Sequence, residues 1–92
     1  MNKIIKLEKA NDGIHKWRAI FNDGKTTKFG ASGMGDYTLT GDKEARRLYR
    51  IRHKKDLDTN NPQRAGYLSY YILWGDSTSI TQNMKSFNKM FG

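Results

Sequence analysis

The tripeptide Asn-Asp-Gly occurs twice within the first 24 residues, at positions 11–13 and 22–24. Asn and Asp tolerate left-handed backbone conformations and Gly adopts positive φ without strain, so this tripeptide is typical of tight turns between paired strands. Residues 14–21, between the two copies, alternate in the manner of a strand with one buried face. The spacing of the two turns therefore predicts a three-stranded antiparallel β-meander.

The strands of this meander are predicted at residues 3–9, 14–21 and 25–29. In the first strand, Ile5 and Leu7 are expected to face the core, and Ile4 breaks the strict alternation. In the second strand, the residues on the face expected to supply the sheet's half of the core are His15, Trp17, Ala19 and Phe21. Each strand is thus expected to bury one face and expose the other.

A first helix is expected to begin near Thr40 or Asp42, which are both favourable N-cap residues, and to end near residue 55. A polar loop is expected at 56–61. The residues that follow the spacing of an inward helical face are Ala45, Leu48, Tyr49 and Arg52. The charged residues are then expected to lie on the outer face.

A second helix is predicted from Asn61, as its N-cap, with Pro62 in the first helical position, to Trp74. It is apolar nearly all round, which is typical of a buried central helix. A third helix follows a Ser-x-x-Gln capping box at 79–82, and its apolar stripe consists of Ile80, Met84, Phe87 and Phe91. The predicted fold class is α+β, with the meander followed by a three-helix C-terminal part in one domain of residues 1–92.

The composition is strongly basic, with 17 Lys and Arg against nine Asp and Glu, a formal net charge of +8. The absence of cysteine excludes disulfides and thiolate metal sites. Lysines interrupt the apolar residues near the N-terminus, which predicts no signal peptide, and the longest apolar run is five residues, which predicts no membrane span. A folded domain with this excess of positive charge is expected to bind a polyanion, although a surface charged for solubility is the alternative.

The basic face of the first helix is the feature that most favours a polyanion. Five cations fall within an arc of roughly 100° at 3.6 residues per turn. They are Lys43, Arg46, Arg47, Arg50 and Lys54. Phosphates lying along such a face would release condensed counterions, and Arg suits both phosphate oxygens and guanine edges. Secondary contacts are predicted at Lys16, Arg18 and Lys28. The alternative interpretation is a solvated face.

Two further segments leave alternatives open. The loop Gly-Ala-Ser-Gly-Met-Gly at 30–35 is either a structural tight loop or a backbone nest for an anion, in which the candidate residues are Gly30, Ser32, Gly33 and Gly35. It lacks the Gly-Lys-Ser/Thr ending of a phosphate-binding P-loop.

The aromatic residues of the second helix are either core or a stacking surface for unpaired bases; they are Tyr67, Tyr70, Tyr71 and Trp74.

Catalysis finds little support in the sequence. Neither His15 nor His53 has a local acidic or nucleophilic partner in a recognisable arrangement. The acidic residues considered for a divalent cation, without the spacing of a metal-binding loop, are Asp36, Asp42, Asp56 and Asp58. We therefore expect no enzyme activity, no cofactor and no bound metal.

Residues 28–75 also carry a family resemblance. The segments KFGASGMGDYT, GDKEARRLYRIRHKK and NNPQRAGYLSYYILWG resemble a family of small basic proteins encoded by nucleocytoplasmic large DNA viruses, including chlorella viruses and mimivirus-like viruses. The resemblance implies a virus-encoded protein in the cytoplasm or nucleus of a host cell, or one packaged in the virion. The order of sheet and helix is also similar to integrase arm-binding domains, but here the cations concentrate on the helix.

The sequence therefore predicts a non-catalytic accessory protein of viral origin that binds nucleic acid through a basic helix, with DNA favoured over RNA. The alternative is a minor virion or capsid-associated protein whose basic face meets an acidic viral protein. Neither membrane association nor a particular oligomeric state is predicted.

Overall fold

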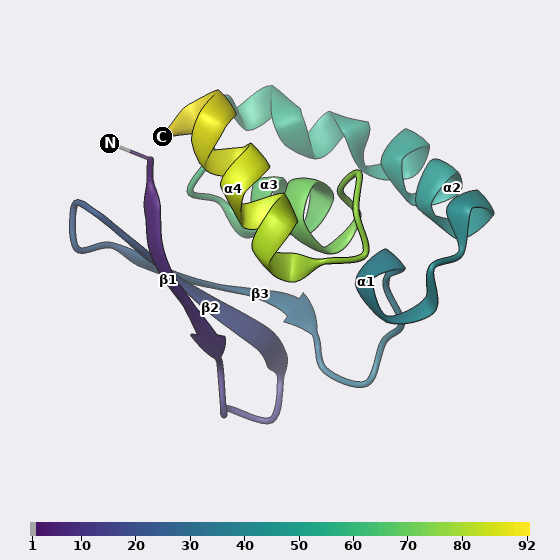
Figure 1. Ribbon diagram of the computed structural model, residues 1–92, viewed down its shortest axis with the longest axis horizontal. Coiled ribbons are helices and arrows are strands. Elements are labelled where there is room, and N and C mark those ends of the chain that lie inside the picture. The colour runs from purple at the N-terminus through teal and green to yellow at the C-terminus, as the bar shows by residue number, and fades with distance from the viewer. Residues whose placement is uncertain (1) are drawn as a thin grey trace.

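The computed structural model describes residues 2–92, and its helices all lie on one side of a small sheet (Figure 1). Strands β1 (Ile4–Lys9), β2 (His15–Phe21) and β3 (Thr26–Ala31) are antiparallel and follow one another in the order β1-β2-β3. The helical elements all come later in the chain. The predicted α+β class, a three-stranded antiparallel meander followed by helices, is confirmed.

Both Asn-Asp-Gly turns form as predicted. The Asp12 carboxylate accepts the backbone N–H groups of Ile14 and His15, at 2.9 and 2.8 Å, and Asp23 accepts that of Lys25 at 3.0 Å. Gly13 and Gly24 have φ values of 73° and 87°, a region that favours glycine. The turns set the register of the sheet, in which Trp17 lies opposite Phe29.

The inward face of β1 differs from the prediction. Ile4 is 2% exposed and Ile5 is 60% exposed, because an irregularity between Ile4 and Lys6 shifts the register of β1 against β2. A bulge of this kind adds one residue to a strand and breaks the two-residue alternation of its side chains. Ile4 and Leu7 therefore both pack on the core although they are three residues apart.

Strand β3 continues two residues further than predicted, into the glycine-rich segment. Gly30 has a φ of +79°, and a Cβ atom there would lie 2.8 Å from Cδ1 of Leu73. Glycine at this position thus permits both the backbone conformation and the close approach of a buried leucine to the sheet. The glycine-rich loop is consequently shorter than the predicted residues 30–35.

After this loop come α1 (Tyr37–Thr40) and α2 (Lys43–His53), which leads directly into η1 (Lys54–Thr59), a 3-10 helix. The Asp42 carboxylate accepts the N–H groups of Glu44 and Ala45, each at 3.0 Å, so the predicted N-cap is confirmed. The prediction of an irregular loop at 56–61 is wrong as far as residue 59. Asn60, with a φ of 53°, ends the 3-10 helix.

The buried central helix begins later than predicted. Asn61 accepts the N–H of Gln63 in a turn, and α3 (Ala65–Leu68) starts only after Arg64, which has an extended backbone. The helix continues as η2 (Ser69–Leu73), a π-helix, and its Leu68, Ile72 and Leu73 are buried. The predicted position of this helix in the core is confirmed, and only its start at Asn61 and Pro62 is wrong.

The C-terminal helix α4 (Ile80–Phe91) begins at Ser79, whose hydroxyl accepts the N–H of Gln82, as predicted. Phe87 is fully buried, and the rest of the predicted stripe is partly buried. Asn88 accepts the N–H of Ile4 at 2.8 Å and donates to its carbonyl at 2.9 Å, which ties the edge strand β1 to α4. None of the helices formed by residues 2–92 is both long and apolar enough to cross a membrane.

Candidate nucleic-acid interface

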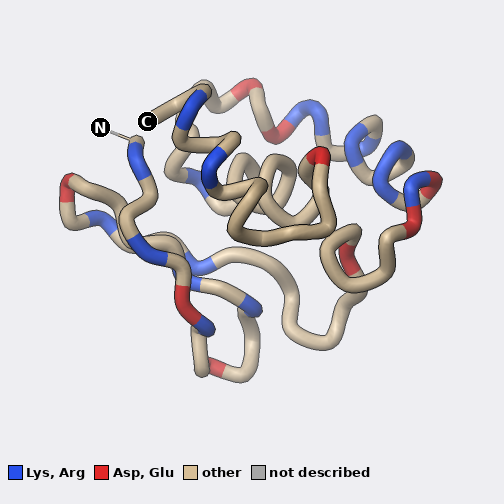
Figure 2. The backbone as a smooth tube through the Cα atoms, viewed as in Figure 1, with Lys and Arg blue, Asp and Glu red and all other residues tan. Residues whose placement is uncertain are grey.

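Positive charge is concentrated on α2 and the start of η1. Residues 43–55 contain seven Lys and Arg and a single acidic residue, and Figure 2 shows them gathered along this part of the chain. The helix contains no fully buried residue. It therefore lies on the surface with most of its charged side chains accessible to a partner.

The inward face of α2 is rotated relative to the prediction. Leu48 is 44% exposed and Arg52 is also exposed, so their predicted inward position is wrong. Ala45 and Tyr49 are half-buried, as predicted. Arg46 and Arg50, which were predicted on the outer face, turn toward the protein and are half-buried as well. Guanidinium groups favour this orientation here because they find carbonyl acceptors and aromatic rings on the neighbouring segment, 70–76.

Arg50 binds the C-terminal end of the central helix. Its Nη1 donates to the carbonyl of Trp74 at 2.7 Å and lies 3.4 Å from that of Tyr70. Its guanidinium lies over the Tyr70 ring, 4.2 Å from the centroid. Carbonyls at a helix C-terminus lack helical partners and carry partial negative charge, so a cation is favourable there. Arg50 is thus fixed in position by the fold.

Arg46 is held one turn away by similar contacts. Its Nε donates to the carbonyl of Gly75 at 2.6 Å, and its Nη2 donates to Asp76 at 2.5 Å. The guanidinium also lies 5.6 Å from the centroid of the Tyr37 ring. The Asp76 side chain is 91% exposed, so water screens this ion pair. Two arginines of the predicted basic face thus join α2 to the protein.

Four of the five predicted cations line one hollow of about 330 Å³. The hollow is bounded by Arg46, Arg47, Arg50, Ile51, Lys54 and Tyr70. Arg47 pairs with Glu44 at 2.5 Å, and both side chains are more than half exposed. Lys54 and Lys43 have no carboxylate within ion-pair distance among residues 2–92. We call this hollow, with Lys43 beside it on α2, the basic hollow.

The predicted secondary contacts lie elsewhere, on the sheet, and each is paired with an acid. Lys16 pairs with Asp36 at 2.5 Å, and its side chain is only 13% exposed. Arg18 pairs with Glu8, and Lys28 lies 3.5 Å from Asp12. None of the three lines the basic hollow.

The contacts of the glycine-rich segment favour a structural tight loop over an anion nest. The N–H of Ser32 donates to Ile14 at 2.8 Å, and that of Met34 donates to Ala31 at 3.2 Å. Gly33, with a φ of +84°, lies in the turn between them, and Gly35 follows. These two N–H groups are therefore already bonded to carbonyls. Asp36, at the end of the loop, is buried and already binds Lys16 and the N–H of Thr38.

The aromatic residues of the central helix divide into two groups. Tyr67 and Tyr70 are each 7% exposed and belong to the core. Tyr71 packs edge-on against Phe91, with ring centroids 5.2 Å apart. Trp74 instead stacks on Tyr49 of α2, with centroids 4.4 Å apart. The core alternative thus fits Tyr67 and Tyr70 best, and Trp74 alone joins an aromatic stack that includes α2.

Both histidines have a carboxylate partner that the sequence reasoning missed. Nδ1 of His15 lies 2.8 Å from Asp12, and Nδ1 of His53 lies 3.1 Å from Asp56. In each pair the two residues are three positions apart, and that spacing was the available signal. Hydrogen bonds from the backbone N–H and the ring of His15, and from the Ile14 N–H, hold the pKa of Asp12 far below its usual range.

Residues 2–92 contain no group of three or more His, Asp or Glu side chains placed to hold a metal ion. Three of the four acidic residues considered from the sequence make separate contacts. Asp42 caps α2, Asp56 binds His53, and Asp36 binds Lys16. The absence of an enzyme activity, a cofactor and a metal requirement stays a prediction.

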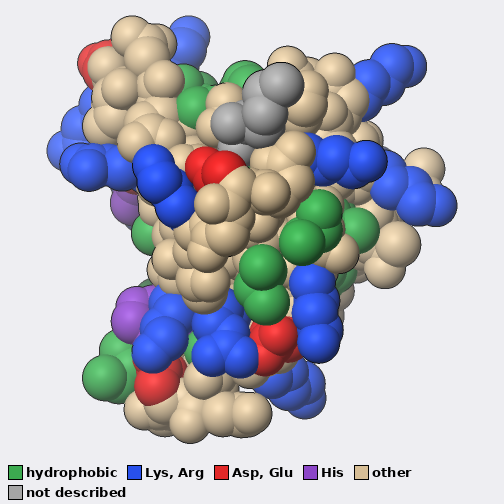
Figure 3. Space-filling model, turned by 90° about the vertical axis from the view of Figure 1, so that its left-hand side faces the viewer, with side chains coloured by type: hydrophobic (Ala, Val, Ile, Leu, Met, Phe, Trp, Pro, Cys, Tyr) green, Lys and Arg blue, Asp and Glu red, His purple; other side chains and the backbone are tan. Residues whose placement is uncertain are grey.

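Positive charge is not confined to α2. Figure 3 shows the side of the molecule that lies on the left in Figure 1, where Lys and Arg side chains occur along both edges and across the lower middle of the face. The basic hollow is distinguished by arginines that backbone carbonyls hold in place. The sheet, loop and helix together define a small basic α+β domain with a cationic surface helix.

The chain belongs to a family of unknown function, DUF5754, which matches residues 5–53. The match covers the sheet except Ile4, the glycine-rich loop, α1 and all of α2. No curated protein and no solved structure matches the chain. The family description gives neither an activity nor a source, so the viral origin implied by the resemblance stays a prediction.

Proposed function

We propose that this protein binds nucleic acid without catalysing a reaction, and that phosphates of the backbone occupy the basic hollow. The contacting residues would be Lys43, Arg46, Arg47, Arg50 and Lys54. The observation that carries the proposal is the convergence of four of these cations on one hollow. Phosphate contacts by Lys and Arg supply most of the affinity in sequence-independent nucleic-acid binding.

The fixed positions of Arg46 and Arg50 support phosphate binding. The hydrogen bonds of Arg50 use Nη1, so its Nη2 and Nε groups keep donors for a phosphate. A side chain already held by the fold loses little further conformational entropy when a ligand binds. The hollow thus combines two positioned guanidiniums with the exposed cations Arg47 and Lys54.

The acidic groups near the hollow offer weak competition. The side chains of Asp76 and Glu44 are 91% and 63% exposed, and exposed ion pairs contribute little net free energy. A phosphate can therefore replace either carboxylate at small cost. Removing all five cations would not test the proposal cleanly, because Arg46 and Arg50 also hold α2 to the protein.

The experiment uses the three cations that, within residues 2–92, form no hydrogen bond with the central helix. The triple variant Lys43→Ala, Arg47→Ala and Lys54→Ala should weaken binding to a 20-base-pair duplex by about 10- to 100-fold at 50 mM salt. The matched control replaces Lys25, Lys85 and Lys89, which are exposed and lie outside the hollow. Equal affinity of the two triple variants in fluorescence anisotropy would contradict the site.

A second function is favoured by one specific observation. Leu48 and Ile51 are 44% and 62% exposed on α2, among its cations. An apolar centre with a charged rim is typical of a protein interface, whereas apolar side chains offer a phosphate neither charge nor hydrogen bonds. The alternative proposal is therefore an acidic protein partner, such as a virion component. Replacing Leu48, which does not line the basic hollow, with Ser should weaken that interaction and leave nucleic-acid binding unchanged.

A further inference from the structure

The two edges of the sheet differ in how their backbone groups are satisfied. At the β1 edge, the Asn88 side chain accepts the N–H of Ile4 and donates to its carbonyl, so an amide from α4 bonds to both groups as a further strand would. Strand β3 pairs with β2 alone and forms the other edge. An edge strand with unpaired backbone groups is a template for pairing with another chain.

The hairpin between β2 and β3 determines which backbone groups of β3 lie on its free edge. The N–H of Phe21 donates to the carbonyl of Lys25 at 2.9 Å, so these two residues are a hydrogen-bonded pair of the antiparallel ladder. Such pairs alternate along a ladder, so Thr27 bonds to β2, whereas the N–H and carbonyl groups of Thr26 and Lys28 point away from it. No group outside the sheet, within residues 2–92, forms a hydrogen bond with these four backbone groups.

The helices contact β3 through its inner face and leave the edge open. Phe29 is buried on that face, and the Thr27 hydroxyl donates to the carbonyl of Gln63 at 2.7 Å. The two residues with outward backbone groups have exposed side chains on the opposite face, away from the helices (Figure 1). Gly30 and Ala31, at the end of the strand, line a hollow of about 370 Å³. There is therefore space beside the edge for another segment of chain.

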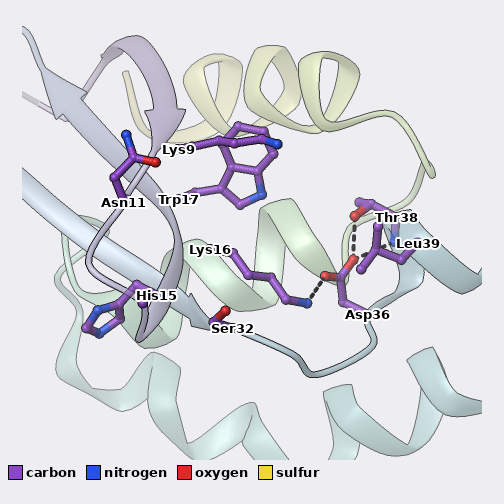
Figure 4. A pocket seen from close by; sticks show the side chains of 10 residues that line it. Lys9, Asn11, His15, Lys16, Trp17, Ser32, Asp36, Thr38 and Leu39 are labelled. Atoms are coloured by element: carbon purple, nitrogen blue, oxygen red, sulfur yellow. Dashed lines mark hydrogen bonds and ion pairs between the residues drawn. The ribbon is translucent and has the colours of Figure 1, made fainter.

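Strand β3 is held at both ends. The hairpin holds its start, and the Ser32 N–H just after its end donates to the carbonyl of Ile14 at 2.8 Å. Further along, the buried Asp36 carboxylate accepts hydrogen bonds from the Lys16 ammonium and the Thr38 hydroxyl, as Figure 4 shows. A strand that is already held in its extended form loses little conformational entropy when another strand pairs with it.

The charge along this edge favours an acidic occupant. Residues 25–31 contain two lysines and no acidic residue. Lys25 is exposed and has no ion pair among residues 2–92, and Lys28, 45% exposed, lies 3.5 Å from Asp12. A second copy of β3 would bring the same lysines to the interface, and like charges placed opposite each other destabilise a sheet. Carboxylates in the added strand would stabilise it instead.

We infer that the free edge of β3 binds an extended acidic segment of a partner protein, which adds a fourth strand to the sheet. The backbone of this segment bonds to the outward groups of Thr26 and Lys28. Every second side chain of the segment lies on the outer face, where Asp or Glu pairs with Lys28. No residue of β3 lines the basic hollow, so this interaction is independent of nucleic-acid binding.

The test uses an acetylated and amidated eight-residue peptide of alternating Glu and Thr, and a control peptide with Lys in place of each Glu. Amide hydrogen exchange is followed by NMR. In the free protein, Thr26 and Lys28 should exchange rapidly and Thr27 slowly. The acidic peptide should bind with a Kd between about 10 and 500 µM and slow exchange at Thr26 and Lys28 by about tenfold. The basic peptide should change neither.

Three variants separate the backbone contact from the charge. Thr26→Pro removes one outward N–H without changing the charge, at a position of an edge strand that tolerates proline. It should weaken binding of the acidic peptide by about 3- to 10-fold, the contribution of one hydrogen bond. Thr26→Val keeps the N–H and should bind like the wild type. Lys28→Thr should weaken binding by about 2- to 5-fold through loss of the charge pair.

Several results would overturn the inference, and the exchange measurement on the wild type yields them without any variant. One is the absence of binding by the acidic peptide up to about 2 mM. Another is a set of NMR shifts confined to α2, since the peptide would then occupy the basic hollow. A third is protection of Thr26 and Lys28 that grows with protein concentration in the absence of peptide, because a second copy would then be the occupant.

Discussion

Arg50 both stabilises the fold and lines the basic hollow. It donates to the carbonyl of Trp74 and lies over the Tyr70 ring, and it also lines the basic hollow. A cation at the end of a helix compensates carbonyls that have no helical partner. Loss of this side chain is therefore expected to affect folding as well as binding.

Arg50→Ala should lower the free energy of unfolding by about 2 kcal/mol, the typical contribution of a hydrogen bond to a charged group together with the cost of unpaired carbonyls. Chemical denaturation measures this change. Arg47→Ala removes an equal charge from the same helix, but its exposed pair with Glu44 should contribute at most about 1 kcal/mol. Equal stability of the two variants would show that Arg50 does not support the fold.

Asp12 gives the protein a pH dependence of known sign. Its folded-state pKa lies far below 3.8, its unperturbed value, chiefly because the backbone N–H of His15 donates to the carboxylate. A lowered folded pKa stabilises the fold above the unfolded pKa, and this stabilisation is lost as pH falls below about 4. Lowered pKa values of Glu8, Asp23 and Glu44 act in the same direction.

Denaturation midpoints of the wild type should therefore fall between pH 5 and pH 2. Asp12→Asn should flatten this dependence, since the amide has no charge to lose, whereas Asp58→Asn should leave it unchanged. Asp58 is exposed and has no ion pair among residues 2–92. Parallel pH profiles for wild type and Asp12→Asn would refute the assignment to Asp12.

At the scale of elements, the contact of β3 with η2 depends on Gly30. Both Gly30 and Gly33 have positive φ, but only at Gly30 would a Cβ atom meet another residue, Leu73, at 2.8 Å. Gly33→Ala should cost about 1 kcal/mol from backbone strain alone. Gly30→Ala should cost more, because buried Leu73 must also shift. Thermal denaturation of the two variants measures the stability that each loses and so separates backbone strain from packing. Equal losses of stability would contradict a close contact between Gly30 and Leu73.

Elements defined by local chemistry could be predicted from the sequence. The turns at 11–13 and 22–24, the Asp42 cap and the Ser79 cap each depend on residues within three positions of one another. The bulge that buries Ile4 could not be predicted, since it depends on pairing with β2 and on packing against α4. The delayed start of α3 could not be predicted either, since the carbonyl of Gln63 accepts a hydrogen bond from the Thr27 hydroxyl of β3 at 2.7 Å, a contact between residues 36 positions apart.

The candidate site was predicted in part. The five cations of α2 follow from helical spacing, but the roles of Arg46 and Arg50 depend on carbonyls 24 to 29 residues away along the chain. A polar residue was assumed to face water, so Leu48 was placed inside and Arg50 outside. The stack of Trp74 on Tyr49 was missed because the two rings meet only in the folded chain.

At the scale of the whole molecule, the net charge of +8 is expected to dominate association. Exposed lysines occur on several faces, so nonspecific attraction alone would involve the whole surface. The proposal makes a narrower claim, that binding is concentrated at α2. The dependence of affinity on salt distinguishes the two, because its slope counts the phosphates that the protein neutralises.

The most direct measurement is the affinity for a 20-base-pair duplex, by fluorescence anisotropy between 50 and 200 mM salt. The logarithm of affinity should fall against the logarithm of salt concentration with a slope corresponding to roughly four to six phosphates. In the variant lacking Lys43, Arg47 and Lys54, the slope should be smaller by about 2 to 3, and in the variant lacking Lys25, Lys85 and Lys89 it should be unchanged. Equal slopes in both variants, or no binding at 50 mM salt, would contradict nucleic-acid binding at the basic hollow.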